Sequence, residues 1–171
     1  MASRQRGFTL LELLVVVLII GLISSFAVLS VGGRDDALRE QSRRLAALIR
    51  LAGEEAIINA TDLALRLRRQ GYAFVQLAPD SRLQPLPDED AGSLRPRTLP
   101  ADIHIRSARI NGLEADLDAA DDAQGGAVVL LYASGEMTPF EIELQAADGA
   151  RYRLRGEFNG VVREPERVSA R

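Results

Sequence analysis

The strongest constraint on the fold is an apolar segment close to the N-terminus. Leu13–Gly33 contains no charged residue, whereas Arg4 and Arg6 precede it and Glu12 adjoins it. As an α-helix this segment would span roughly 32 Å at about 1.5 Å per residue, which matches a hydrocarbon core of about 30 Å. Because short basic flanks stay in the cytoplasm, we expect a single membrane-spanning helix with the rest of the chain on the opposite side, which in a bacterium is the periplasm.

A cleaved secretory signal would explain the same residues differently. Such a signal has a basic start, an apolar stretch and small residues before the cleavage site, which Ser25 and Ala27 would provide. Glu12 argues only weakly against it, because this residue lies near the basic end. From residue types alone, a retained anchor and a removed signal both stay open.

A short motif at the start of the segment distinguishes these alternatives. The sequence GFTLLE, from Gly7 to Glu12, resembles the type III signal of type IV pilins and type II secretion pseudopilins. That family has a short basic leader, a glycine before the cleavage site, an aromatic first mature residue and a glutamate at the fifth mature position. The resemblance implies that residues 1–7 are a leader, that prepilin peptidase cleaves between Gly7 and Phe8, and that Phe8 is N-methylated. Residues 8–33 would be retained as a transmembrane and assembly helix.

Glu12 then needs a physical explanation, because a carboxylate within a membrane costs about 2.5–3.5 kcal/mol on insertion scales. The resemblance implies that its partner is the N-terminal amine of Phe8 in a neighbouring subunit. Such a buried pair would set the axial register of subunits in a fibre. The alternative is that Glu12 only reaches the lipid headgroups.

Helical periodicity continues beyond the apolar segment. Gly32 and Gly33 weaken a helix, so we expect a bend there. Residues 34–60 then form the predicted periplasmic half of the long helix, which should end at about Ile58. Its apolar positions recur at helical spacing and are Leu38, Leu45, Leu48, Ile49, Ala52 and Ala56.

From residue 61 the pattern changes to alternation, which predicts an antiparallel β globular domain over 61–171. A hairpin is expected around Gln70-Gly71, and a later strand containing Tyr152 and Leu154 lies between the turn signals Asp148-Gly149 and Asn159-Gly160. Further strands are expected at 103–110, 127–132 and 140–144. The rest of the proline-rich and acidic region 79–126 is expected to be irregular and flexible. The predicted fold class is α+β, a long N-terminal helix packed on an antiparallel β-sheet domain, as in pilins.

Two further segments resemble the H-type pseudopilins more specifically. They are Leu45–Leu67 and the sequence SGEMTPF from Ser134 to Phe140. The resemblance implies a minor pseudopilin of the bacterial inner membrane that helps initiate or cap the pseudopilus, the fibre that drives export of folded proteins across the outer membrane. Implied partners are the I-, J- and K-type minor pseudopilins, the major G-type pseudopilin, the prepilin peptidase and the inner-membrane assembly platform. The alternative is a minor pilin of a type IV pilus, including those involved in DNA uptake.

The composition argues against an enzyme. The 171-residue chain has no cysteine, and His104 is its only histidine, so a transition-metal or histidine-dependent catalytic centre has little support. Ser134 lies in a predicted turn without the nucleophile-elbow pattern. We therefore expect neither catalysis nor a cofactor, whereas a periplasmic enzyme with a plain signal would need a catalytic constellation.

An acidic cluster is a candidate calcium site. Its members are Asp116, Asp118, Asp121 and Asp122. However, Ala120 occupies the third ligand position of an EF-hand and no glycine follows it, so a solvated acidic loop is the favoured interpretation.

A basic stripe is a candidate phosphate-binding surface. Arg151, Arg153 and Arg155 share one face of a predicted strand, and Arg163, Arg167 and Arg171 follow. Against this, the formal net charge of the chain is −3, from 21 basic and 24 acidic residues. A solvated strand face or a charged contact with another subunit is therefore favoured, and nucleic-acid binding is not expected.

Overall fold

The computed structural model describes residues 10–87, 91–119 and 126–169, and for residues 22–34 the description is of the backbone. The chain divides into two compact units, Met1–Asp36 and Ala37–Arg171. The helix α1, Leu10–Ile58, contributes residues to both units. Its last residue confirms the helix end predicted at about Ile58.

In the N-terminal unit, α1 is helical from Leu10 and continues without interruption through Gly32 and Gly33. Both glycines therefore lie within the helix, and the bend expected at them stays a prediction. Within the part of the chain whose side chains are described, no helix has the combination of length and hydropathy needed to cross a membrane.

In the C-terminal unit, one stripe of α1 is buried. Leu38, Leu45 and Ile49 are completely buried, whereas Glu40 and Arg43 between them are exposed. These spacings of four and seven residues return to the same side of a helix, which explains why the apolar side chains form one stripe. The helical spacing predicted from Leu38 to Ala56 is thereby confirmed.

The end of α1 is closed by backbone hydrogen bonds. The amide of Thr61 donates to the carbonyl of Ala56 at 3.0 Å, and the amide of Ala60 donates to that of Ile57 at 3.3 Å. Ala60 adopts a positive φ of 49°. This is the Schellman pattern, which satisfies helix carbonyls that would otherwise lack a donor.

The first sheet of the C-terminal unit runs in the order β3-β2-β1-β7, and β4 pairs with β2. Its core is the predicted hairpin, in which Leu63 lies opposite Gln76 and Arg68 lies opposite Gly71. The turn is therefore Arg69-Gln70, one residue earlier than expected. The strands are β1 (Leu63–Arg68), β2 (Gly71–Leu77), β3 (Leu83–Pro85), β4 (Arg97–Thr98) and β7 (Val128–Leu131).

The second sheet is antiparallel and runs in the order β10-β9-β8-β5-β6. Tyr152 and Leu154 of β9 are buried, while the arginines that alternate with them face away from the core, as predicted. The turn glycines Gly149 and Gly160 have φ values of 87° and 82°, which glycine adopts without strain. The strands are β5 (Ile103–Ile110), β6 (Leu113–Glu114), β8 (Phe140–Ala146), β9 (Arg151–Gly156) and β10 (Glu166–Arg167).

The region 79–126 contains more secondary structure than its prolines indicated. It holds β3, the 3-10 helix η1 (Gly92–Leu94), β4, the expected strand β5, and β6. Pro85 lies in β3 at the edge of the first sheet, where its missing amide costs no ladder hydrogen bond. Leu94 and Leu99 are buried and anchor the segment to the core, which explains its order between the prolines.

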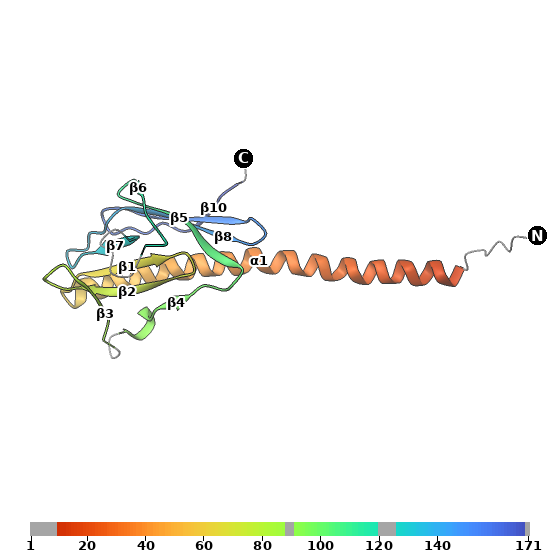
Figure 1. Cartoon of the computed structure of the whole chain (residues 1–171), viewed down its shortest axis with the longest axis horizontal. Coiled ribbons are helices and arrows are strands. Elements are labelled where there is room, and N and C mark those ends of the chain that lie inside the picture. The colour runs from red at the N-terminus through yellow and green to blue at the C-terminus, as the bar shows by residue number, and fades with distance from the viewer. Residues whose placement is uncertain (1–9, 88–90, 120–125, 170–171) are drawn as a thin grey trace, which may run out of the picture. The chain divides into compact units, whose positions relative to one another are not determined.

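One hydrophobic cluster joins the elements of the C-terminal unit. It combines the buried stripe of α1 with the inner faces of both sheets, which lie alongside this part of the helix (Figure 1). The packing is close, because a Cβ placed at Gly156 of β9 would lie 2.1 Å from the ring of Phe140 in β8. A continuous core of this kind holds the outer faces of the sheets in fixed register.

Candidate functional site

The predicted processing site lies at the start of the chain. Gly7 and Phe8 are outside the described residues, so cleavage and N-methylation stay predictions. Glu12 lies in the first turn of α1, where its residue is exposed. An acidic side chain at this end of a helix is favoured by the helix dipole.

The helix surface around Glu12 is apolar and exposed. Every described side chain from Leu10 to Ile20 other than Glu12 is a large aliphatic group, with exposures from 42% at Val15 to 86% at Leu10. An apolar surface exposed on all sides of a helix marks a segment that meets lipid or other helices. This surface, with the carboxylate at its N-terminal end, is the candidate assembly site.

The basic stripe of β9 lies against acidic side chains of β8. Arg153 donates to Oε1 of Glu143 through Nε at 3.1 Å and through Nη2 at 2.5 Å. Glu143 is only 9% exposed, so these hydrogen bonds replace the water that its carboxylate would otherwise contact. The hydrogen bonds that Arg153 donates to Glu143 raise the pKa of Arg153 above its ordinary value.

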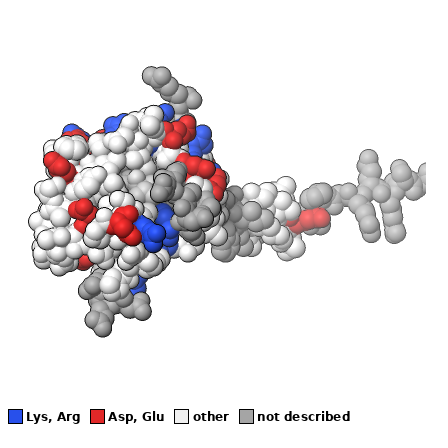
Figure 2. Space-filling model, turned by 60° about the vertical axis from the view of Figure 1, so that its left-hand side comes forward, with Lys and Arg blue, Asp and Glu red and all other residues white. Residues whose placement is uncertain are grey.

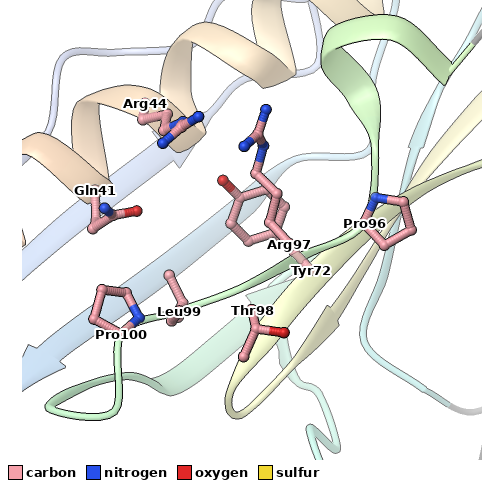
Figure 3. A pocket seen from close by; sticks show the side chains of 8 residues that line it. All are labelled: Gln41, Arg44, Tyr72, Pro96, Arg97, Thr98, Leu99 and Pro100. Atoms are coloured by element: carbon pink, nitrogen blue, oxygen red, sulfur yellow. The ribbon is translucent and has the colours of Figure 1, made fainter.

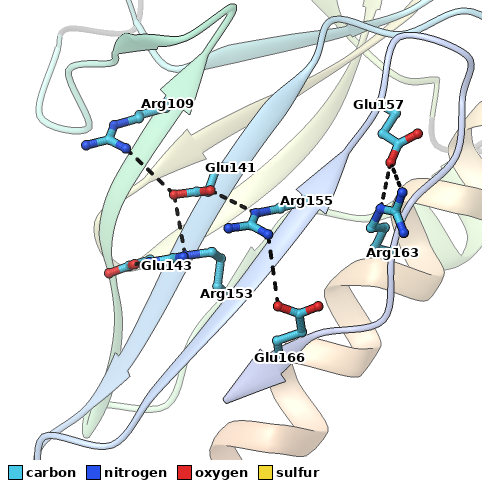
Figure 4. A network of polar contacts seen from close by, with 8 residues as sticks. All are labelled: Arg109, Glu141, Glu143, Arg153, Arg155, Glu157, Arg163 and Glu166. Carbon is cyan, nitrogen blue, oxygen red and sulfur yellow. Dashed lines mark hydrogen bonds and ion pairs between the residues drawn. The ribbon is translucent and has the colours of Figure 1, made fainter. Parts of the chain in front are cut away.

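The same pattern continues along the strand pair, as Figure 4 shows. Arg155 donates from Nε to Oε2 of Glu141 at 2.9 Å, and Arg153 Nε lies 3.4 Å from the other oxygen of that carboxylate. Arg109 of β5 reaches Glu141 at 3.8 Å, and Arg155 lies 4.0 Å from Glu166 of β10. We call the set Arg109, Glu141, Glu143, Arg153, Arg155 and Glu166 the charge ladder.

The charge ladder bears on the interpretation of the basic stripe. Each of its guanidinium groups faces a carboxylate, and Arg163 is paired in the same way with Glu157 at 2.5 Å. Figure 2 shows acidic and basic residues side by side on the face of the C-terminal unit that is in view. Phosphate binding needs guanidinium groups whose charge is not already neutralised, so the favoured interpretation is a paired sheet face. Arg171 lies outside the described residues.

The acidic cluster is also partly engaged. Arg69 Nη2 lies 2.5 Å from Oδ2 of Asp118, and this hydrogen bond lowers the pKa of Asp118. The Asp118 amide donates to Oδ1 of Asp116 at 2.9 Å, which closes a local turn. Asp121 and Asp122 fall outside the described residues. In the described part of the chain, no group of three or more potential metal ligands comes together.

The remaining candidates have local structural roles. His104 lies in β5 opposite Gln145 of β8 and is half-buried. Ser134 lies in the turn before Gly135, and its hydroxyl is 3.4 Å from Oε2 of Glu136. The position of Ser134 fits the turn predicted for it.

Comparisons with known protein families match two regions of the chain. The prokaryotic N-terminal methylation motif matches residues 2–28, and the family described as type II transport protein GspH matches residues 41–160. Type II secretion system protein H of Aeromonas hydrophila is 33% identical over 152 residues, covering 85% of this chain and 83% of that protein. The protein of the same name from Klebsiella pneumoniae is 27% identical over 161 residues, covering 90% and 94%.

Solved structures share the fold. The crystal structure of the minor pseudopilin EpsH from the type II secretion system of Vibrio cholerae matches with a TM-score of 0.63 at 20% identity, covering 80% of this chain and 99% of that one. The solution structure of E. coli GspH matches with a TM-score of 0.57 at 17% identity, covering 78% and 89%.

A methylation motif, an exposed apolar helix and a helix packed on two antiparallel sheets together define a pilin-like subunit. Within that class the chain belongs to the family of type II transport protein GspH, the H-type minor pseudopilins. The matches favour type II secretion over the alternative of a type IV pilus.

Proposed function

We propose that this chain is a subunit of the type II secretion pseudopilus and helps to initiate or cap the fibre. The fibre lies in the periplasm and drives export of folded proteins across the outer membrane. The observation that carries the proposal is the exposed apolar surface Leu10–Ile20, which lies within the segment that matches the methylation motif. A surface of this kind is stable only in lipid or against similar helices of other subunits.

Processing would prepare the helix both for the membrane and for contact with the helices of other subunits. Prepilin peptidase cleaves after Gly7, and the new amine of Phe8 is methylated, which keeps its positive charge. Residues 8–33 anchor the subunit in the inner membrane by a single pass before assembly, and the C-terminal unit lies in the periplasm. The uncharged length of Leu13–Gly33 and the basic residues before it support this orientation.

Glu12 would couple assembly to register. Its carboxylate pairs with the methylated amine of Phe8 on a neighbouring subunit. Neither charge then remains unpaired in the membrane or in the fibre. An unpaired carboxylate in the membrane costs about 2.5–3.5 kcal/mol, so each correctly placed neighbour relieves that cost. The exposed position of Glu12 in the first turn of α1 leaves it accessible to such a partner.

The proposed partners follow from family membership. They are the I-, J- and K-type minor pseudopilins, the major G-type pseudopilin, the prepilin peptidase and the inner-membrane assembly platform. The role is structural, and we propose no catalytic activity of the chain itself. Arg153 and Arg155 already pair with carboxylates in the charge ladder, which supports a structural role over DNA binding.

A substitution at Glu12 tests this proposal. In a deletion strain, the Glu12→Ala chain should stay in the membrane at the wild-type level but fail to restore the exported proteins to the medium. The matched control is Glu40→Ala, which removes the same charge from an exposed position of the same helix. Secretion and fibre incorporation at wild-type levels with Glu12→Ala would refute the pairing.

A further inference from the structure

A cleft in the C-terminal unit joins three elements that are distant in sequence. It has a volume of ≈ 410 Å³ and lies between Gln41 and Arg44 of α1 and the segment Pro96–Pro100, which contains β4. Figure 3 shows the Tyr72 hydroxyl of β2 directed toward the space between Arg44 and Arg97. A phenol and two guanidinium groups therefore face one space.

Two polar atoms of this cleft have no hydrogen-bond partner within the described part of the chain. They are the hydroxyl oxygen of Tyr72 and Nε of Arg97, and both are shielded from solvent. Tyr72 as a whole is 4% exposed. Buried polar groups are nearly always hydrogen-bonded, so two unsatisfied donors side by side point to a missing acceptor.

The charge of the cleft is also uncompensated. Among the described residues, neither Arg44 nor Arg97 forms an ion pair, and the contact of Arg97 is a hydrogen bond from Nη2 to the carbonyl of Ser93 at 3.1 Å. In the charge ladder, by contrast, each arginine faces a carboxylate. Burial raises the pKa of Tyr72, so its hydroxyl stays protonated and able to donate.

The backbone holds these donors in place. Tyr72 lies opposite Arg97 in the β2–β4 pairing, and the amide of Leu99 donates to the carbonyl of Gln70 at 2.8 Å. The approach at Gly71 is so close that a Cβ there would lie 2.3 Å from the Arg97 carbonyl oxygen. The two orphaned donors therefore belong to a site whose backbone geometry is already formed before a ligand binds.

We propose that this cleft binds the carboxylate of an acidic side chain on an adjoining subunit of the fibre. The inference rests on the proposed function, because a subunit packed in a fibre meets protein surfaces, and the anions of those surfaces are carboxylates. A carboxylate would accept from Nε of Arg97 and from the Tyr72 hydroxyl after these side chains turn toward the cleft, because both atoms are shielded from solvent in the unbound chain. Leu99 and Pro100 line the cleft and supply apolar contact for the rest of the partner side chain.

Peptide binding to the full-length chain in detergent micelles tests the proposal. The probe is the blocked tripeptide acetyl-Leu-Glu-Leu-amide, and the reference is the same peptide with glutamine. We expect the glutamate peptide to bind at least tenfold more tightly by calorimetric titration. Equal binding of the two peptides would overturn the proposal.

Three variants locate the binding. The double variant Arg44→Gln with Arg97→Gln should weaken the glutamate peptide at least tenfold, and Tyr72→Phe, which keeps the buried ring, should weaken it at least threefold. The control Arg82→Gln removes an exposed guanidinium that pairs with Asp80 in another turn, and should change nothing. Unchanged affinity in both cleft variants would refute the assignment.

Two further probes identify the source of the carboxylate. If acetyl-Leu-Gln-Leu with a free C-terminus binds more tightly than the glutamate peptide, the side-chain assignment is wrong. Inorganic phosphate binding as tightly as the glutamate peptide would overturn the carboxylate assignment. This titration needs no fibre, so it is independent of the Glu12 experiment. Either experiment can fail without changing how the result of the other is interpreted.

Discussion

Replacing Glu143 by glutamine should destabilise the C-terminal unit, because this carboxylate is the most buried member of the charge ladder. Glu143 accepts two hydrogen bonds from Arg153, at 3.1 and 2.5 Å, and is 9% exposed. Hydrogen bonds to charged groups contribute about 1.5–3 kcal/mol, but Arg153 keeps Glu141 at 3.4 Å, and its side chain is 29% exposed. We therefore expect the free energy of unfolding to fall by about 1–2 kcal/mol.

Urea unfolding of the full-length chain in detergent micelles measures this effect. The matched control is Glu157→Gln, which breaks the exposed pair between Glu157 and Arg163 at 2.5 Å. Exposed pairs contribute about 0–1 kcal/mol, so the control should lose less than Glu143→Gln. Equal losses for the two variants would count against this explanation, since both pairs have contacts of 2.5 Å and the pair of Glu143 is the more buried.

Three further substitutions test the packing, the helix interior and the pH dependence of stability. Gly156→Ala places a Cβ 2.1 Å from Phe140 and should lower stability by about 1–3 kcal/mol, whereas Gly53→Ala in the helix interior meets no atom within 4 Å and should raise it by about 0.5–1 kcal/mol, both measured by urea unfolding. Stabilisation by Gly156→Ala would contradict the packing. The hydrogen bond from Arg69 lowers the pKa of Asp118 below its ordinary 3.8. This hydrogen bond therefore contributes to folding stability above pH 3.8, and the contribution is lost as pH falls through the pKa of Asp118 in the folded state. Asp118→Asn should therefore lose less stability than the wild type below about pH 4, and parallel acid-unfolding curves would exclude this linkage.

Most of the fold could be predicted from local sequence patterns. The alternation in Leu63–Leu67 and the Asp148-Gly149 turn depend on neighbouring residues, so both hairpins could be predicted. The partners of the arginine stripe were missed, although a signal was present. Glu141 and Glu143 alternate before that turn as the arginines alternate after it, and a hairpin there places them opposite each other.

Features that depend on residues distant in the sequence could not be predicted from local patterns. The strand β4 has only two residues, and Pro96 precedes it, so its pairing to Gly71 and Tyr72 leaves no periodic signal. The cleft beside it needs α1, β2 and β4 together, which the sequence does not specify by spacing. The N-terminal methylation motif, by contrast, could be recognised without a structure, because it depends only on residue order and spacing within GFTLLE.

The intact mass of the native protein, extracted from the cell envelope, tests the central claim most directly. We expect a chain that begins at N-methylated Phe8 and keeps the apolar segment Leu13–Gly33. A soluble chain that begins after Ala27 and lacks methylation would contradict it, because neither the anchor nor the Glu12 pair would then exist in the mature protein.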